Sequence, residues 1–199
     1  QGATVYNPYS TSTSVLVGTL TNMSTTGTST AWVLGKFGKG LLFDGVNDTV
    51  TVNDNTSSGL DIKSAGSLSA WIKPTSVSGN KYIIDKAENT AYALLLSGAN
   101  VKGYFGNSSC SGGTAKANEW SYVSVAWDGA YIRCYLNGTQ VAQTTYSTAL
   151  TPQNTSLYIG SDGGAASWFS GLIDEPKIYQ YALSPVQIKK DYNDGLVVA

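Results

Sequence analysis

The sequence contains no histidine among its 199 residues. Histidine is the commonest metal ligand and the commonest general base, so its absence excludes Ser-His-Asp and Cys-His arrangements. Charged side chains are also scarce: they make up 13 % of the chain, and the formal net charge is −1. A chain without a basic patch lacks the electrostatic footprint of proteins that bind nucleic acid or anionic lipid. We therefore expect neither as a partner.

Long apolar runs are missing too. No stretch approaches the roughly 20 apolar residues that a membrane span requires, so we expect no membrane insertion. The chain begins at Gln1 rather than Met, and we expect an excised part of a larger multidomain protein, with neighbouring domains in the same parent chain. Its length suits one large all-β domain over residues 1–199. Ser, Thr, Asn and Gly dominate its polar surface, which favours a secreted or cell-surface location.

Cysteine is nearly absent, with only Cys110 and Cys134 in the chain. Two thiols alone cannot make a zinc site. A disulfide between them would close a loop of roughly 25 residues and add on the order of 3 kcal/mol of stability. The alternative is a pair of free thiols, with Cys134 buried beside Ile132 and Leu136. The sequence leaves both possibilities open.

Strand signals fill most of the chain, as short alternating runs bounded by Gly, Asn and Asp. Two dipeptides, Asp128-Gly129 and Asn137-Gly138, predict hairpin turns because both tolerate a positive φ. The expected strands cover residues 15–20, 67–74, 91–98, 102–107, 121–127, 131–136, 139–144, 156–161 and 171–179. About eight to twelve strands in all indicate a two-sheet antiparallel sandwich.

One helix is expected, over residues 184–192 with the sequence SPVQIKKDY. Ser184 fits the N-cap, Pro185 the first helical position, and Gln187 completes a capping box. Gly195 is expected to end the helix. The predicted fold is therefore all-β with one short C-terminal helix.

Four segments, in this order along the chain, resemble the laminin G-like module of the concanavalin A-like lectin/glucanase superfamily. They are GKFGKGLLFDGVNDTVTV (35–52), GSLSAWIKP (66–74), NEWSYVSVAWDGAYIRCYLNGTQV (118–141) and FSGLIDEPKIYQYALSPVQIKKDYNDG (169–195). The resemblance implies a jelly-roll sandwich of two curved antiparallel sheets. It also implies a non-catalytic part of a secreted or surface protein, which binds glycans or proteins and often carries one Ca²⁺. At the start of the chain, NPYSTSTS replaces the usual loop of the family.

Asp174 and Glu175 form the one adjacent carboxylate pair in these segments. Successive side chains of a strand point to opposite faces, so the two are expected to diverge. Glycosidases need two carboxyls about 5.5 Å or 6.5–9.5 Å apart across one cleft. The Glu-x-Asp-x-Glu type of run found in glucanases of this superfamily is absent. We therefore expect no catalytic residues and no enzyme activity.

The resemblance assigns Asp174 a different role, in a structural calcium site. Asp174 and Asp44 match the family positions that contribute to such a site, and backbone carbonyls near Asn7 would complete it. Calcium takes six to eight oxygen ligands, carbonyls included, in flexible geometry. The alternative is that Asp174 accepts hydrogen bonds from loop amides, while Glu175 faces solvent or pairs with a lysine.

The candidate ligand-binding residues are aromatic and amide side chains in the middle and late parts of the chain. A large aromatic side chain ends the polar loop SDGGAAS, and two tyrosines lie on neighbouring expected strands. Two asparagines nearby would supply directional polar contacts of the kind that such sites require. The five residues are Trp168, Tyr104, Tyr92, Asn100 and Asn107. Tyr92 also fits the core side of its strand.

The sequence thus predicts a lectin-like, non-catalytic binding module whose partner is a glycan or a surface protein, with carbohydrate as the first candidate. A structural or adhesive spacer in a large surface protein is the alternative. A glycan-cleaving enzyme that uses a constellation not visible in the sequence is the third.

Overall fold

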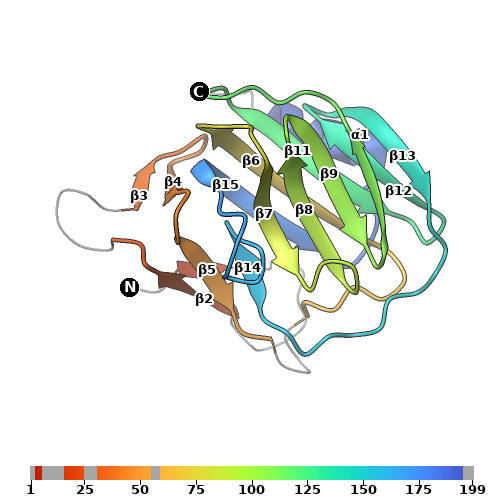
Figure 1. Cartoon of the computed structure of the whole chain (residues 1–199). Helices are drawn as coiled ribbons and strands as arrows, with labels where there is room; N and C mark the ends of the chain where they lie inside the picture. Colours follow the sequence, from red (N-terminus) through yellow and green to blue (C-terminus); the bar gives the residue numbers. More distant parts are fainter. Residues whose placement is uncertain (1–2, 6–15, 25–30, 55–58, 195–199) are drawn as a thin grey trace.

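The computed structural model describes residues 3–5, 16–24, 31–54 and 59–194. These residues form two antiparallel sheets that face each other across one hydrophobic core (Figure 1). The predicted two-sheet sandwich with one helix is confirmed. The described part of the chain has fifteen strands, more than the eight to twelve expected, because several short edge strands lack a clear sequence signal.

The strands divide into sheet A and sheet B, here given in their spatial order. Sheet A contains β1 (Ala3–Val5), β2 (Leu16–Thr21), β5 (Thr49–Val52), β14 (Leu157–Ile159), β7 (Asn80–Lys86), β8 (Tyr92–Ser97), β9 (Asn100–Phe105) and β10 (Ser108–Gly112). Sheet B contains β13 (Thr139–Thr145), β12 (Tyr131–Leu136), β11 (Ser121–Trp127), β6 (Gly66–Pro74), β15 (Ser170–Tyr179), β4 (Lys39–Asp44) and β3 (Trp32–Leu34). The late strands β14 and β15 insert between earlier ones, so the C-terminal part of the chain completes both sheets.

The predicted hairpin turns are present, and their backbone angles explain them. Asn137 and Gly138 both have positive φ, 51° and 75°, which matches the right-handed twist of the two strands that they join. At the other turn, the Asp128 carboxylate accepts the N–H groups of Ala130 and Tyr131 at 2.9 and 2.8 Å. Strands β11 and β12 therefore have the bounds that the sequence predicts.

The start of β9 differs from the prediction. The strand begins at Asn100, two residues before the expected Lys102, because Gly98 adopts φ 59° and makes a two-residue turn with Ala99. Ser97 then pairs directly with Asn100. The alternation along β9 thereby places Asn100, Lys102 and Tyr104 on one face of sheet A.

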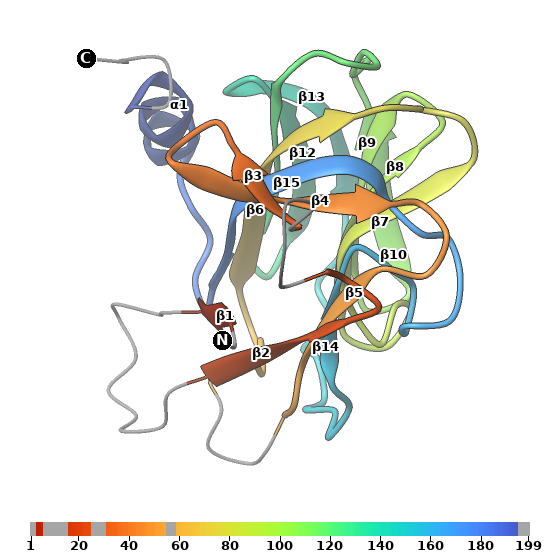
Figure 2. The same ribbon diagram turned by 90° about the vertical axis from the view of Figure 1, so that its left-hand side faces the viewer.

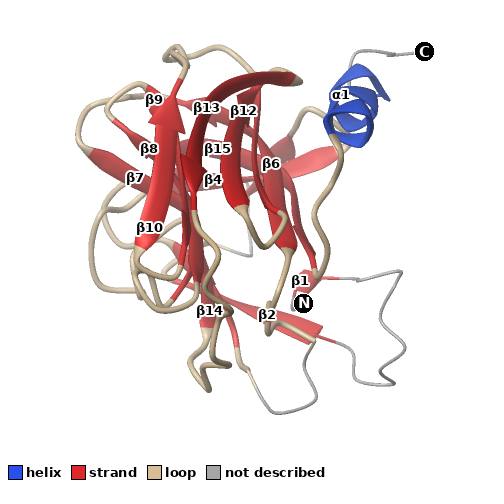
Figure 3. Cartoon of the chain, turned by 90° about the vertical axis from the view of Figure 1, so that its right-hand side faces the viewer, coloured by secondary structure: helices blue, strands red, loops and turns tan. Residues whose placement is uncertain are grey.

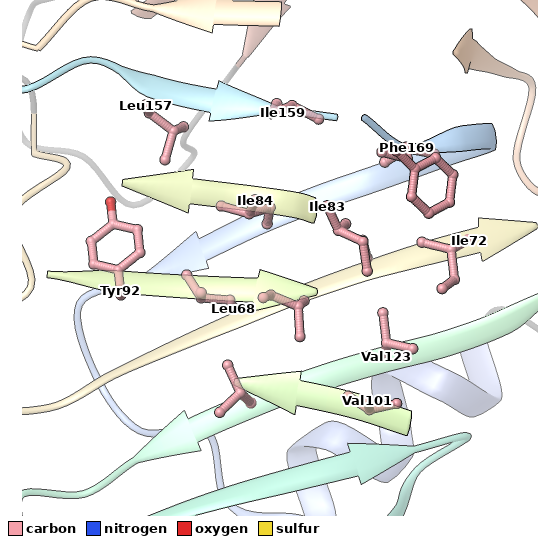
Figure 4. Packing of buried hydrophobic residues seen from close by; sticks show 14 of the residues in the cluster. Leu68, Ile72, Ile83, Ile84, Tyr92, Val101, Val123, Leu157, Ile159 and Phe169 are labelled. Carbon is pink, nitrogen blue, oxygen red and sulfur yellow. The ribbon is translucent and has the colours of Figure 1, made fainter. Parts of the chain in front are cut away.

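The core between the sheets is formed by the inward residues of both layers. Phe169 packs edge-to-face on Phe43, and Trp127 lies 5.4 Å from Phe105 between ring centroids. Figure 4 shows how side chains of β7, β8, β9 and β14 meet those of β6 and β11. Trp127 is 1 % exposed and belongs to this core.

A disulfide joins the two layers at one edge. Cys110 of β10 in sheet A is bonded to Cys134 of β12 in sheet B, with 5.9 Å between their Cα atoms. The sequence left open whether these two cysteines form a disulfide or remain free thiols, and the structure has the disulfide. The bond links strands that share no backbone ladder, so it couples the two sheets directly.

Helix α1 (Pro185–Asp194) begins with the predicted capping box. The Ser184 N–H donates to the Gln187 side-chain oxygen at 2.9 Å, and the Gln187 N–H donates to the Ser184 hydroxyl at 3.3 Å. Among the residues that the structure describes, no helix has the length and apolar character needed to cross a bilayer.

Candidate functional site

The outer face of sheet B is occupied by α1. Ile188 of the helix is buried in a cluster with Trp71, Tyr122 and Leu183, while Tyr192 stacks on Trp71 at 5.7 Å between ring centroids. Figure 3 shows the helix on the sheet B side of the sandwich, opposite β7, β8 and β9. The aromatic residues on this face thus serve to dock the helix.

Hydrogen bonds reinforce this docking. The hydroxyls of Tyr122 and Tyr179 donate to one carboxylate oxygen of Asp191, at 3.4 and 3.3 Å. Burial raises the pKa of both tyrosines, and the nearby Asp191 charge raises it further. Both hydroxyls therefore stay protonated and keep donating to the helix over the physiological range.

Sheet A, in contrast, has no helix on its outer face within the described residues, as Figure 2 shows from the side. A small apolar cluster of Tyr82, Ala93 and Leu95, with Tyr104 packed against it, lies there apart from the main core. Strand register places Asp85, Ala93 and Tyr104 in one row across the sheet. We call the outward residues of β7, β8 and β9 the sheet-A face: Tyr82, Asp85, Ala93, Leu95, Lys102 and Tyr104.

Tyr104 is the half-buried aromatic residue of this face. The Lys102 ammonium lies 4.7 Å from its ring centroid, in cation–π range. Its hydroxyl is hydrogen-bonded to Glu88, which belongs to the turn between β7 and β8. Tyr104, Lys102 and Glu88 therefore place an aromatic ring, an ammonium and a carboxylate side by side.

The carboxylates of the sheet-A face are in an unusual electrostatic environment. Burial raises the pKa of Asp85 to about 6, against the lowering effect of a hydrogen bond from Gly163, and the charge of Asp162 adds to the rise. Burial also raises the pKa of Glu88, where the hydrogen bond from Tyr104 and the charge of Lys102 act in the opposite direction. Carboxyls with raised pKa values are found more often at functional sites than elsewhere.

A compact loop from Gly160 to Phe169 borders the face beside β7 (Figure 1). Its two ends are joined by a 2.8 Å hydrogen bond from the Phe169 N–H to the Gly160 carbonyl. Gly164 has φ 72°, and a Cβ there would lie 2.8 Å from the Tyr158 ring, so the loop needs glycine to pack this closely on β14. Loops of this closed kind are often functional.

The structure brings together only part of the predicted ligand set. Tyr104 and Asn100 share one face of β9, and Trp168 is half-buried at the end of the loop that borders that face. Asn107 lies in the turn after β9, about 20 Å from Asn100 along the strand. The two asparagines therefore cannot contact one small ligand together.

Tyr92 does not belong to the site. It is 1 % exposed within the main core, and its hydroxyl donates to the Leu60 carbonyl at 2.7 Å. The physical reason is strand alternation: Tyr92, Leu94 and Leu96 point between the sheets, while Ala93 and Leu95 point outward. We therefore remove Tyr92 from the candidate ligand-binding residues.

Four charged residues of the site were not among the sequence-based candidates: Asp85, Glu88, Lys102 and Asp162. Their grouping depends on the pairing of β7 with β8 and β14, which no local pattern shows. The one available signal was a carboxylate at position 85, within the otherwise apolar run YIID.

The predicted calcium ligands lie in sheet B and do not converge. Asp44 pairs with Ser170 across β4 and β15, and Asp174 is four residues further along β15, about 13 Å away. The oxygens of Asp174 accept the N–H groups of Phe37 and Glu175, at 2.8 and 2.9 Å. One ion shared by Asp44 and Asp174 does not fit this arrangement.

The remaining predicted ligand, Asn7, lies outside the described residues. Within the described ranges, no group of three or more Asp, Glu, Cys or His side chains is arranged to hold a metal ion. Asp44 itself accepts the N–H groups of Val46 and Asn47, at 2.8 and 3.2 Å, and so organises its own turn.

Asp174 and Glu175 diverge, as the sequence predicts. A bulge follows Asp174 in its pairing with β6, and Glu175 has φ 48°. Asp174 is buried, whereas Glu175 is exposed and lies 3.3 Å from the Lys177 ammonium. The two carboxylates therefore have separate structural roles.

Residues 43–189 match the family model of the concanavalin A-like lectin/glucanases superfamily. A comparison with curated protein sequences gives no match.

Several solved structures share the fold. Domain 4 of AbnA, a GH43 extracellular arabinanase from Geobacillus stearothermophilus solved in complex with arabinotriose, superposes with a TM-score of 0.69 and 23 % identity over 87 % of each chain. The receptor binding domain of botulinum neurotoxin C/D mosaic serotype has a TM-score of 0.66 and 15 % identity, over 91 % of this chain and 48 % of that one. A candidate carbohydrate-binding protein from Bacteroides ovatus has a TM-score of 0.63 and 17 % identity, over 76 % of this chain and 45 % of that one. The chain spans about half the length of the last two, and identities this low establish the fold alone.

Proposed function

We propose that this chain, which belongs to the concanavalin A-like lectin/glucanase superfamily, is a non-catalytic carbohydrate-binding module of a secreted or cell-surface protein. The observation that carries the proposal is the sheet-A face, where half-buried Tyr104 and charged groups lie over a buried apolar cluster and no described helix covers the sheet. The arabinotriose complex of AbnA domain 4 supports it, because that domain has the same fold and binds a sugar.

The chemistry of the face suits a sugar ring. Tyr104, which is half-buried, supplies an aromatic ring for the C–H side of a sugar, and the buried cluster that contains Tyr82 and Leu95 packs against that ring. Glu88 and the Lys102 ammonium offer an acceptor and a donor for its hydroxyl groups. Sites for small ligands are built in this way, from apolar area and a few directional polar groups. Hydrogen bonds to charged groups contribute about 1.5–3 kcal/mol each, enough to give specificity.

The charges of the face favour a neutral sugar. The electrostatics of Glu88 involve both Asp162 and Lys102, while Asp85 is also influenced by Asp162. Three carboxylates thus face one ammonium. A ligand anion about 5 Å from two uncompensated carboxylates is repelled by roughly 1 kcal/mol at physiological salt, about fivefold in Kd. We therefore assign the site to uncharged oligosaccharides over sialylated, uronic or sulfated ones.

A glycan-array screen of the purified domain, followed by titration of Tyr104→Ala, tests this function. We expect neutral oligosaccharides to bind and Tyr104→Ala to weaken binding by about tenfold or more, because the ring provides the aromatic contact. Tyr131→Ala is the matched control, since Tyr131 is a tyrosine on sheet B whose surface is 38 % exposed. Equal losses in both variants would contradict the proposed site. An array without any bound glycan would favour the spacer.

Calcium removal should leave sugar binding unchanged. The sheet-A face lies on the opposite sheet from Asp44 and Asp174, the residues that the family resemblance assigns to calcium. We expect the same Kd in calcium and in EDTA, measured by calorimetry on the same protein. A Kd that rises in EDTA would place a metal next to the sugar, which the described donors of sheet A do not predict. Thermal unfolding under the two conditions tests the structural calcium ion independently.

A further inference from the structure

Asp85 connects two chain segments that border the sheet-A face. One oxygen of its carboxylate accepts the Gly163 N–H at 3.0 Å, and the other accepts the Glu88 N–H at 3.2 Å. Gly163 belongs to the loop from Gly160 to Phe169, and Glu88 to the turn between β7 and β8. The side chain is 2 % exposed, so water does not replace either bond.

Both segments hold backbone conformations that side chains disfavour. Ala87 and Ser167 each have φ 49°, in the left-handed region. A non-glycine residue there costs on the order of 1 kcal/mol and persists only where surrounding contacts impose it. Asp85 makes one of these contacts in each segment. Ser167 is held as well by its carbonyl, which accepts the Tyr82 N–H at 3.2 Å.

The two segments also carry the groups that a sugar would meet at the border of the face. Glu88, which accepts from the Tyr104 hydroxyl, follows Ala87 in one of them. Trp168 follows Ser167 in the other and is half-buried. A change in the turn therefore moves Glu88 beside Tyr104. A change in the loop moves Trp168, whose neighbour Ser167 bonds to Tyr82 of β7.

We propose that Asp85 is a positioning residue of the sugar site: its ionised carboxylate fixes both bordering segments and so places Glu88 and Trp168 around the sheet-A face. The inference rests on the proposed function of that face. Only an ionised carboxylate has two oxygens that can each accept an N–H. A protonated Asp85, or an asparagine, keeps one acceptor and turns a donor toward the second N–H.

The surroundings of Asp85 set the pH at which its carboxylate becomes protonated. The titratable groups around it are Glu88, Asp162, Tyr158 on β14, Tyr104 and Lys102 on β9, and the core residue Tyr92. Lys102 is placed over Tyr104, so Asp85 accepts only from neutral amides. Its pKa is accordingly raised from 3.8 to about 6, chiefly by burial. Sugar binding should weaken as the pH falls through about 6.

The free energy of unfolding should respond to protonation of Asp85 in the direction opposite to sugar binding. A folded-state pKa above the unfolded value means that the folded protein binds the proton more tightly. The contribution of Asp85 to stability is thus fully present below pH 3.8 and is lost as the pH rises through about 6. As the pH falls, the positioning role thus predicts that the Gly163 and Glu88 amides lose protection while the contribution of Asp85 to global stability increases. A residue that only stabilised the fold would not show these opposite trends.

Asp85→Asn tests the proposal, with Glu119→Gln, at an exposed carboxylate away from the site, as the control. Without sugar, we expect Asp85→Asn to lower hydrogen-exchange protection of the Gly163 or Glu88 amide by about tenfold or more, the value of one hydrogen bond to a charged group. Glu119→Gln should leave this protection in place at pH 7.5. With the neutral oligosaccharides of the screen, arabinotriose included, Asp85→Asn should raise Kd by about the same factor and remove its pH dependence.

The outcomes separate the two proposals. Unchanged amide protection in Asp85→Asn would overturn the positioning role, and so would lower protection with an unchanged Kd. Lower protection in a protein whose wild type binds no sugar would overturn the proposed function and leave the loop contacts standing. If Asp85→Asn does not fold, wild-type Kd and Gly163 protection measured between pH 7.5 and pH 5 replace it, and a flat profile of both would contradict the inference.

Discussion

Replacing Lys86 with methionine should lower the free energy of unfolding by about 3–5 kcal/mol, the cost of breaking a buried ion pair from one side. The Lys86 ammonium lies 2.8 Å from an Asp54 oxygen and 3.0 Å from an Asp61 oxygen. It also donates to the Gln153 carbonyl at 2.5 Å. The side chains of Lys86 and Asp54 are both 0 % exposed. Methionine would fill the volume but leave two carboxylates without their cation.

Urea denaturation measures this effect, with Lys116→Met as the control. Lys116 pairs with Glu119 at 3.6 Å on the surface, where both side chains are more than half exposed. Its loss should leave the midpoint almost unchanged. The double variant Lys86→Met with Asp54→Asn should recover part of the stability, because it also removes one of the uncompensated charges. Equal midpoints for Lys86→Met and Lys116→Met would contradict this account of the ion-pair triad that Lys86 forms with Asp54 and Asp61.

The triad matters because it ties three connections together at one end of the sandwich. Asp54 follows β5, Asp61 precedes β6, and Gln153 precedes β14. Lys86 itself ends β7, and its neighbour Asp85 points to the opposite side of the sheet. Adjacent residues thus have separate duties: Lys86 holds the end of the core, and Asp85 holds the border of the sheet-A face.

The second large effect should come from the disulfide. The double variant Cys110→Ser with Cys134→Ser should be less stable than the wild type by about 3 kcal/mol, since the bond closes a loop between two cysteines that are 24 positions apart in the sequence. Urea denaturation gives the value. A reducing agent should destabilise the wild type by the same amount and have no effect on the double variant. A wild type that is insensitive to reduction would show that the bond adds nothing to the coupling of the two sheets.

The fold was largely predictable because its signals are local. The Asn137-Gly138 turn requires two positive φ angles that this dipeptide adopts readily, and the capping box at Ser184 and Gln187 is complete within four residues. The disulfide was not predictable in this way. Whether Cys110 meets Cys134 depends on how an edge strand of sheet A lies over sheet B, which local sequence does not encode.

The candidate site was predictable only in part, for a related reason. Tyr104 could be identified because alternation along its strand leaves it on the outside. Asp85 could not, because a carboxylate in an apolar strand acquires its role from two amides that are 3 and 78 residues away in sequence. The calcium ligands were carried over from a family pattern. The register of β4 with β15 shows that two of them, Asp44 and Asp174, stand about 13 Å apart.

The most direct test of the sugar site is a titration of the isotopically labelled domain with neutral oligosaccharides, followed by amide chemical shifts. The account predicts that the largest changes occur at Leu95, Lys102, Tyr104 and Gly163, with none at the α1 surface of sheet B. Changes centred on Tyr131 or α1 would place the ligand on the opposite sheet and contradict the account. The absence of any change, for every neutral sugar that the array contains, would contradict carbohydrate binding itself.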